Sequence, residues 1–155
     1  MADHEGMEVD RNGLEVLTEA EALQLLSTVP VARLGLSIGA LPVVLPVNFV
    51  VDGKDIVVKT AEGSKLDAAL RYSVVAVEAD AIDPISHHGW SVLVQGTSRV
   101  LTLPGEIERA RSLPLRSWAS DDGDRFMAIS IDMVSGRRIH PEYGFVAALA
   151  KAHHR

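Results

Sequence analysis

The fold is decided by one segment, residues 46–65, which reads PVNFVVDGKDIVVKTAEGSK. Two apolar runs flank Asp52-Gly53, a dipeptide that between such runs is a strong signal of a β-hairpin. The second run ends at Thr60, and Gly63-Ser64-Lys65 then opens a helix-like segment. The segment therefore predicts two paired strands. It also gathers a hydroxyl, backbone N–H groups and an ammonium where the second strand ends.

Further strand and helix patterns occur on both sides of this hairpin. Thr18 and Glu21 fit a capping box, and we expect breaks in pairing at prolines within strands. Strand follows strand without regularly alternating helices, which indicates an antiparallel barrel or sandwich. The predicted class is mainly β with short α-helices. The predicted strands are 31–37, 41–51, 54–60, 73–79, 90–103 and 126–139, the last broken near Ser135-Gly136; the predicted helices are 18–27, 64–71 and one starting at Pro104.

Length and composition exclude several classes of protein. The chain has 155 residues, which favours one domain, and we predict it over 13–145 with tails at 1–12 and 146–155. Cysteine is absent, which excludes disulfides and thiolate metal sites. The net charge of -6 argues against a general nucleic-acid binder. No apolar run approaches the length of a membrane span, and the first residues lack a signal-peptide pattern, so we expect a cytoplasmic protein.

The Gly63-Ser64-Lys65 turn is the strongest candidate for binding an anion. A helix N-terminus presents unpaired N–H groups and partial positive charge, Lys65 adds an ammonium, and Thr60 adds a hydroxyl. The alternative is that Ser64 only caps the helix and Lys65 is only solvated. Neither a P-loop nor a G-x-G-x-x-G motif is present. We also expect no metal site, because the adjacent His87 and His88 would point to opposite sides of an extended segment.

Two segments together resemble a known family. The string P-V-N-F-V-x-D-G-x-x-I-V-V-x-T-x-x-G-S-K, followed by WSVLVQG at 90–96, is similar to the pyridoxamine 5′-phosphate oxidase-like proteins, and more closely to their small flavin-nucleotide-binding branch. The resemblance implies a split β-barrel that forms a homodimer. It also implies that FMN binds at the dimer interface.

The resemblance assigns roles to particular residues. Backbone atoms of three consecutive residues would edge the isoalloxazine ring, four residues would lie beside or hold the ribityl-phosphate, and two would come from the other subunit. Arg138-Ile139-His140 resembles the R-L-H motif with which the true oxidase holds its substrate. Arg138 and His140 are therefore candidates for holding a substrate. The cofactor residues so implied are Pro46, Val47 and Asn48 for the ring; Lys59, Thr60, Ser64 and Lys65 for the ribityl-phosphate; and Trp90 and Ser91 from the other subunit.

Departures from the family pattern leave the function open. The strand at 44–49 is neutral where the true oxidase has basic residues, and Asp132 stands where that enzyme has a tryptophan, which argues against authentic pyridoxamine phosphate oxidation. The first hypothesis is an FMN-dependent oxidoreductase acting on an unknown small substrate. A second is a reductase that uses the deazaflavin F420 on the same fold. A third is a non-catalytic protein that binds flavin or haem.

Overall fold

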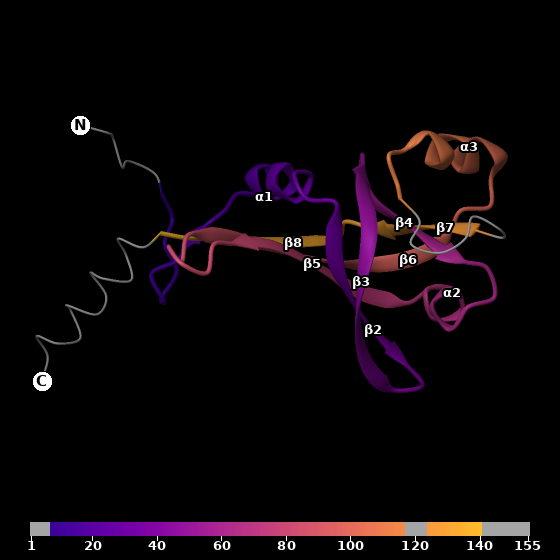
Figure 1. The fold of residues 1–155 in the computed structure, drawn as a ribbon, viewed down its shortest axis with the longest axis horizontal. Coiled ribbons are helices and arrows are strands. Elements are labelled where there is room, and N and C mark those ends of the chain that lie inside the picture. The colour runs from indigo at the N-terminus through magenta and orange to yellow at the C-terminus, as the bar shows by residue number, and fades with distance from the viewer. Residues whose placement is uncertain (1–6, 117–123, 141–155) are drawn as a thin grey trace, which may run out of the picture.

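The computed structural model describes residues 7–116 and 124–140. Its elements follow one another as strands with three short helices between them (Figure 1). In chain order they are β1 (Glu15–Val16), α1 (Glu19–Leu26), β2 (Val31–Ile38), β3 (Leu41–Asp52), β4 (Asp55–Ala61), α2 (Lys65–Ala69), β5 (Val74–Ile82), β6 (Gly89–Val100), α3 (Pro104–Ser112), β7 (Asp124–Ser130) and β8 (Met133–Ile139). None of the helices within these ranges is long and apolar enough to cross a membrane.

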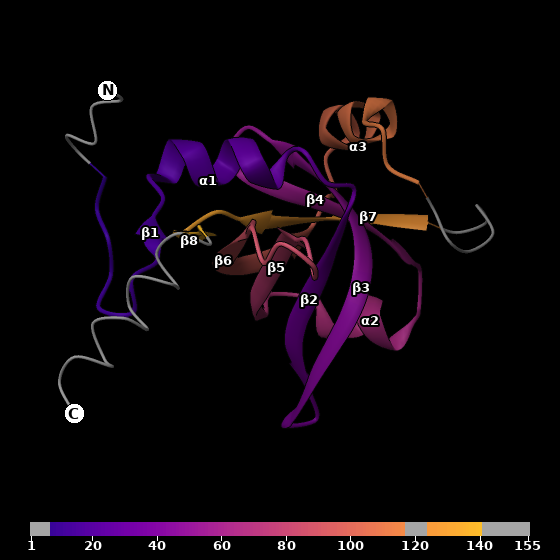
Figure 2. The same ribbon diagram turned by 60° about the vertical axis from the view of Figure 1, so that its left-hand side comes forward.

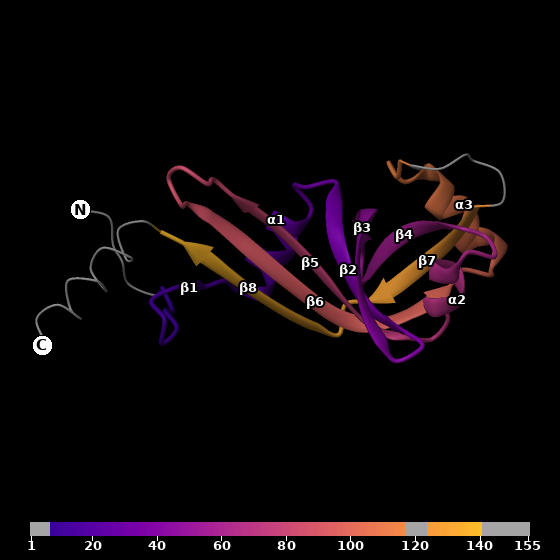
Figure 3. The same ribbon diagram turned by 60° about the horizontal axis from the view of Figure 1, so that its bottom comes forward.

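The strands form a closed antiparallel barrel with an extension. Their order is β1-β8-β6-β5-β2-β3-β4-β7, and an additional pairing of β6 with β7 closes a ring of six strands. β8 and β1 continue the sheet outward from β6, beyond the barrel (Figure 3). The prediction of a mainly β, antiparallel barrel is confirmed.

The predicted hairpin forms, but its two-residue turn lies at Gly53-Lys54, one position later than the predicted Asp52-Gly53. Asp52 pairs with Asp55, and Gly53 has a φ of 62°, a left-handed conformation that glycine adopts without strain. β3 pairs with β2 up to Asn48 and with β4 from Phe49 onward. Its first two-thirds therefore has one partner strand only, which is the edge position where prolines are tolerated.

The predicted position of the break in the last strand is wrong. Residues 126–139 were expected to form one strand broken near Ser135-Gly136, but the break falls at Ile131-Asp132, between β7 and β8. The reason is a change of partner. β7 pairs with β4 and with the end of β6, whereas β8 pairs with the first half of β6. Gly136 lies inside β8, where a Cβ would meet Leu17 at 2.9 Å and Ala22 at 3.2 Å.

Two apolar clusters hold these layers together. The larger fills the barrel with aliphatic side chains and extends under α1, which lies over β8 (Figure 2). Thr18 caps α1: its Oγ1 accepts from the Glu21 N–H at 3.2 Å, and its own N–H donates to Glu21 Oε2 at 2.8 Å, which confirms the capping box. The smaller cluster lies beneath α3 and contains Val57, Leu101, Ala110 and Ala128.

Candidate functional site

The turn after β4 is organised by a serine cap. Ser64 Oγ accepts from the Asp67 N–H at 3.0 Å, so Ser64 is the N-cap of α2. Gly63 has a φ of 77° and donates its N–H to Asp67 Oδ2 at 2.9 Å. That N–H is therefore already engaged within the chain. Lys65, the first residue of α2, is exposed. The turn offers an incoming anion the Ser64 hydroxyl and the Lys65 ammonium.

A buried carboxylate and two arginines lie directly behind this turn. Asp67 has 1% of its surface exposed, and its Oδ1 lies 3.1 Å from Arg125 Nε. Arg71 approaches its Oδ2 at 3.4 Å, and Arg125 also pairs with Glu62. With Lys65 included, three cations accompany two carboxylates among the side chains described here. The excess of one positive charge favours binding of an anion.

Neither Asp67 nor Arg125 was among the residues predicted from the sequence. Asp67 had a local signal, because Ser64-Lys65-Leu66-Asp67 has the spacing of a capping box with aspartate in the acidic position. Arg125 had none. It reaches the turn because β7 pairs with β4, which sets Arg125 opposite Thr60.

The predicted residues of β3 and β4 divide between the two faces of the barrel wall. Side chains alternate along a strand. Pro46, Asn48 and Lys59 lie on the outer side, where Asn48 Nδ2 donates to the carbonyl of Arg116 at 2.8 Å and Lys59 Nζ lies 6.0 Å from the centre of the Phe126 ring. Val47 and Thr60 are buried. The Thr60 hydroxyl donates to the Arg125 carbonyl at 3.4 Å and so faces β7.

A second group of predicted residues lies on the extension formed by β6, β8 and β1. Trp90 pairs with Arg138, and Ser91 pairs with Arg137. Trp90 is half-buried against the core, while Ser91 shares the outer face with Gln95. β1, at the edge of this extension, and α2 lie at opposite ends of the molecule (Figures 1 and 3). The structure therefore brings the predicted residues together as two separate groups.

Acidic residues of the N-terminal segment pair with three basic residues at the end of β8, Arg137, Arg138 and His140. Arg138 Nη1 lies 3.0 Å from Glu15 Oε1, and His140 Nε2 lies 2.5 Å from Glu15 Oε2. Arg137 Nε lies 2.9 Å from Asp10 Oδ2. Backbone hydrogen bonds from Leu14, together with Arg137, lower the pKa of Asp10. Glu8 and Asp10, within the predicted tail, are thus hydrogen-bonded to the domain.

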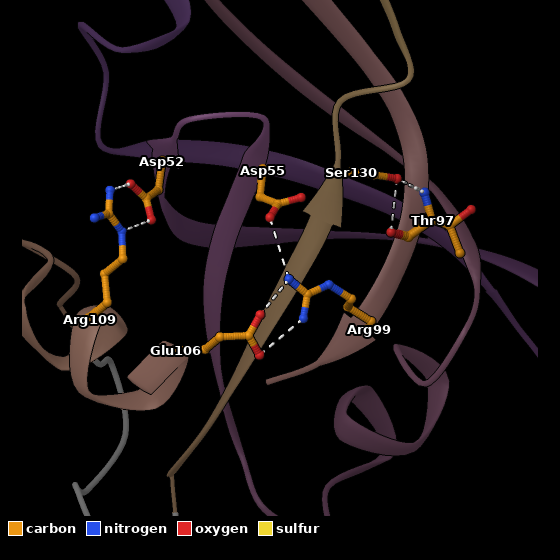
Figure 4. A network of polar contacts seen from close by, with 7 residues as sticks. All are labelled: Asp52, Asp55, Thr97, Arg99, Glu106, Arg109 and Ser130. Carbon is orange, nitrogen blue, oxygen red and sulfur yellow. Dashed lines mark hydrogen bonds and ion pairs between the residues drawn. The ribbon is translucent and has the colours of Figure 1, made fainter. Parts of the chain in front are cut away.

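A third polar group surrounds a cavity of about 220 Å³ beneath α3. Figure 4 shows Arg99 between Glu106, at 3.0 Å, and Asp55, at 3.6 Å. Arg109 Nε donates to Asp52 Oδ2 at 2.7 Å, and this hydrogen bond lowers the pKa of Asp52. The apolar part of the cavity lining is the smaller cluster. The ion pairs join residues of α3 to residues of the barrel strands and so stabilise the position of α3.

Comparisons with known proteins agree on the fold. A family model described as pyridoxamine 5′-phosphate oxidase matches residues 18–138. The uncharacterized protein Rv0080 of Mycobacterium tuberculosis is 37% identical over 129 residues, which cover 79% of this chain and 84% of that protein. A Corynebacterium glutamicum structure, described provisionally as a pyridoxamine 5′-phosphate oxidase, is 31% identical with a TM-score of 0.72 and covers 81% of this chain and 98% of its own. The FAD-binding protein of Mycobacterium smegmatis is 28% identical with a TM-score of 0.70, covering 81% and 97%.

Proposed function

The chain belongs to the pyridoxamine 5′-phosphate oxidase-like family and has its flavin-binding split-barrel fold, and on that premise we propose that it is an FMN-dependent oxidoreductase acting on a small substrate. The observation that carries the proposal is the turn after β4. The Ser64 hydroxyl and the Lys65 ammonium lie there in front of the ion pair of Arg125 with Asp67, and the cations around the turn exceed the carboxylates by one. A phosphate monoester is an anion that accepts several hydrogen bonds, and this donor set suits it.

The chain's own residues would bind and orient the cofactor. Lys65 and the Ser64 hydroxyl would hold the phosphate, with Lys59 and Thr60 on the strand beside it. Backbone atoms of 46–48 would border the ring. Bound flavin supplies hydride transfer, and the protein supplies position and electrostatics. Arg138 and His140 would hold the substrate.

We further propose that the active form is a homodimer. The two groups of predicted residues lie at opposite ends of one chain, so a second copy is needed to bring Trp90 and Ser91 to the turn after β4. The outer face of the sheet also suits a partner. A row of paired residues crosses it from Val44 to Met133, and Val44, Met133 and Val74 on this face are 67%, 66% and 80% exposed. Three exposed apolar side chains on one face of a sheet favour an interaction site there.

FAD is the second candidate for the cofactor. The M. smegmatis relative is described as an FAD-binding protein, and it is 28% identical to this chain. FAD shares the flavin ring and adds an adenylate, so the same turn would then hold a diphosphate. F420 and haem are weaker candidates. F420 is more anionic than the charge at this turn favours, and a haem would need an axial ligand.

Titration of the purified protein with FMN and with riboflavin tests the role of the turn. The two ligands share the ring and differ by the phosphate. We expect Lys65→Ala to weaken FMN binding about ten- to a hundredfold, because it removes a charged hydrogen-bond donor worth about 1.5–3 kcal/mol, and to leave riboflavin binding unchanged. Lys54→Ala is the matched control, since Lys54 is an exposed lysine in the β3–β4 hairpin. Equal FMN affinity in the two variants would contradict the proposal.

A further inference from the structure

The N-terminal segment forms a small hairpin that brings a carboxylate to the end of β8. Val9 bridges to Glu15, the Val16 N–H donates to the Glu8 carbonyl at 2.8 Å, and Asp10 Oδ1 accepts from the N–H groups of Asn12 and Leu14. β1 then pairs with β8, which sets Glu15 directly opposite Arg138. The position of Glu15 is therefore fixed by main-chain pairing.

Both carboxylate oxygens of Glu15 are engaged by the residues proposed to hold the substrate. Glu15 Oε1 accepts a hydrogen bond from Arg138 Nη1 at 3.0 Å. Glu15 Oε2 lies 2.5 Å from His140 Nε2. The Glu15 side chain is 12% exposed, whereas those of Arg138 and His140 are 32% and 34% exposed. Trp90, Arg138 and Glu15 are neighbours in one row of the sheet. Glu15 thus stands where an anionic group of a substrate would pair with Arg138.

The electrostatic consequence is a change in the charge that this site accepts. A phosphate or carboxylate arriving at Arg138 would lie beside a fixed carboxylate, and like charges at a few ångströms repel strongly at a half-buried site. A carbonyl or hydroxyl carries no such penalty. Arginine has five N–H donors, so Arg138 keeps donors for an uncharged acceptor while it pairs with Glu15.

We propose that Glu15 is a specificity-determining residue: by pairing with Arg138 and His140, it makes the site select a substrate that presents an uncharged carbonyl or hydroxyl group, in preference to a phosphorylated one. The inference rests on the proposed function, in which Arg138 and His140 hold the substrate. It predicts that the preference for ligand charge depends on one side chain, Glu15, which lies outside the Arg138-Ile139-His140 motif.

The test compares two ligands that differ only in a phosphate, pyridoxine and pyridoxine 5′-phosphate, by calorimetric titration of the full-length protein. We expect the wild-type protein to bind the phosphorylated ligand no more tightly than the other. Glu15→Gln removes the charge and keeps hydrogen-bonding capacity. It should raise affinity for pyridoxine 5′-phosphate about tenfold and leave affinity for pyridoxine unchanged.

Two further variants isolate the effect. Asp10→Asn is the matched control: it removes one negative charge from the same hairpin, but Asp10 pairs with Arg137, which points to the opposite face from Arg138. It should change neither affinity. Arg138→Gln leaves Glu15 without its partner and should lower affinity for the phosphorylated ligand below the wild-type value. This variant keeps the test valid if Glu15→Gln does not fold.

The proposal is overturned if Glu15→Gln does not bind pyridoxine 5′-phosphate more tightly than wild type, or if Asp10→Asn raises that affinity equally. It is also overturned if Arg138→Gln leaves the wild-type affinity unchanged. The flavin absorbance of each sample is recorded separately. Calorimetry detects the preference for charge with or without bound flavin. A protein that neither carries flavin nor binds added FMN but shows the charge effect would refute the proposed cofactor and support the role of Glu15.

Discussion

Gly96 lies where the barrel closes, and replacing it with alanine tests the closure. At this point β6 stops pairing with β8, whose last pair is Gln95 with Met133, and begins to pair with β7 at Ser98. A Cβ on Gly96 would overlap the carbonyl oxygen of Ser130 and lie 2.7 Å from its carbonyl carbon. Both are backbone atoms, so no side-chain rotation relieves the contact. β6 and β7 must separate.

The cost of Gly96→Ala can be worked from these contacts. Overpacking of this kind costs about 1–3 kcal/mol. Separation also disturbs the hydrogen bond from the Thr97 N–H to Ser130 Oγ, which is 3.0 Å long, and the neighbouring pair of Ser98 with Ile129. Each lost bond adds about 1 kcal/mol. We therefore expect the free energy of unfolding to fall by about 3–5 kcal/mol, a large share of the roughly 5–15 kcal/mol typical of a domain.

Urea unfolding followed by circular dichroism measures this loss, and Gly35→Ala is the matched control. Gly35 also lies in a central strand, but a Cβ there meets only Ala76, at 3.7 Å, which is ordinary contact. Its replacement should change stability by less than about 1 kcal/mol. The reasoning is refuted if Gly96→Ala unfolds at the wild-type urea midpoint, or if the two variants lose equal stability.

Two further predictions concern single polar groups. Ser98→Ala should lower the free energy of unfolding by about 1–3 kcal/mol, because the buried Ser98 hydroxyl donates to the Leu70 carbonyl at 2.6 Å and accepts from the Ser73 N–H at 3.3 Å; urea unfolding measures it, and an unchanged midpoint would contradict it. Asp52→Asn should cost no more than about 1 kcal/mol at pH 7, because Arg109 is largely exposed. The hydrogen bond from Arg109 lowers the pKa of Asp52 below its ordinary value of 3.8, so the stability it contributes is present above about pH 4 and is lost as pH falls through the lowered pKa. The gap between wild type and Asp52→Asn should therefore narrow in acid, and a gap that widens would contradict the assignment.

Local signals in the sequence were enough to predict most elements. Asp52-Gly53 predicted the central hairpin because a two-residue turn needs little from the rest of the chain. Thr18 and Glu21 predicted the start of α1 because a capping box is complete within four residues. Both are contacts between residues close in sequence, and the structure contains both.

The remainder depends on partners far apart in the sequence. The break between β7 and β8 carries no glycine or proline. It is fixed by the Ile131 N–H donating to the Lys54 carbonyl and the Asp132 N–H donating to the Gln95 carbonyl, at 2.9 and 3.2 Å. β1 has only two residues, too few for a pattern. In the candidate site, Arg125 reaches Asp67 only because β7 pairs with β4, and no sequence motif indicates that pairing.

The proposed binding of FMN is tested most directly by the absorption spectrum of the freshly purified protein, followed by chromatography of any cofactor released by heat. The account predicts the two absorption bands of an oxidised flavin and a released cofactor that co-elutes with FMN. If the protein is colourless, saturable binding of added FMN would sustain the account. A protein that neither carries a flavin nor binds FMN would contradict it, and the Gly63-Ser64-Lys65 turn would then be only a helix cap.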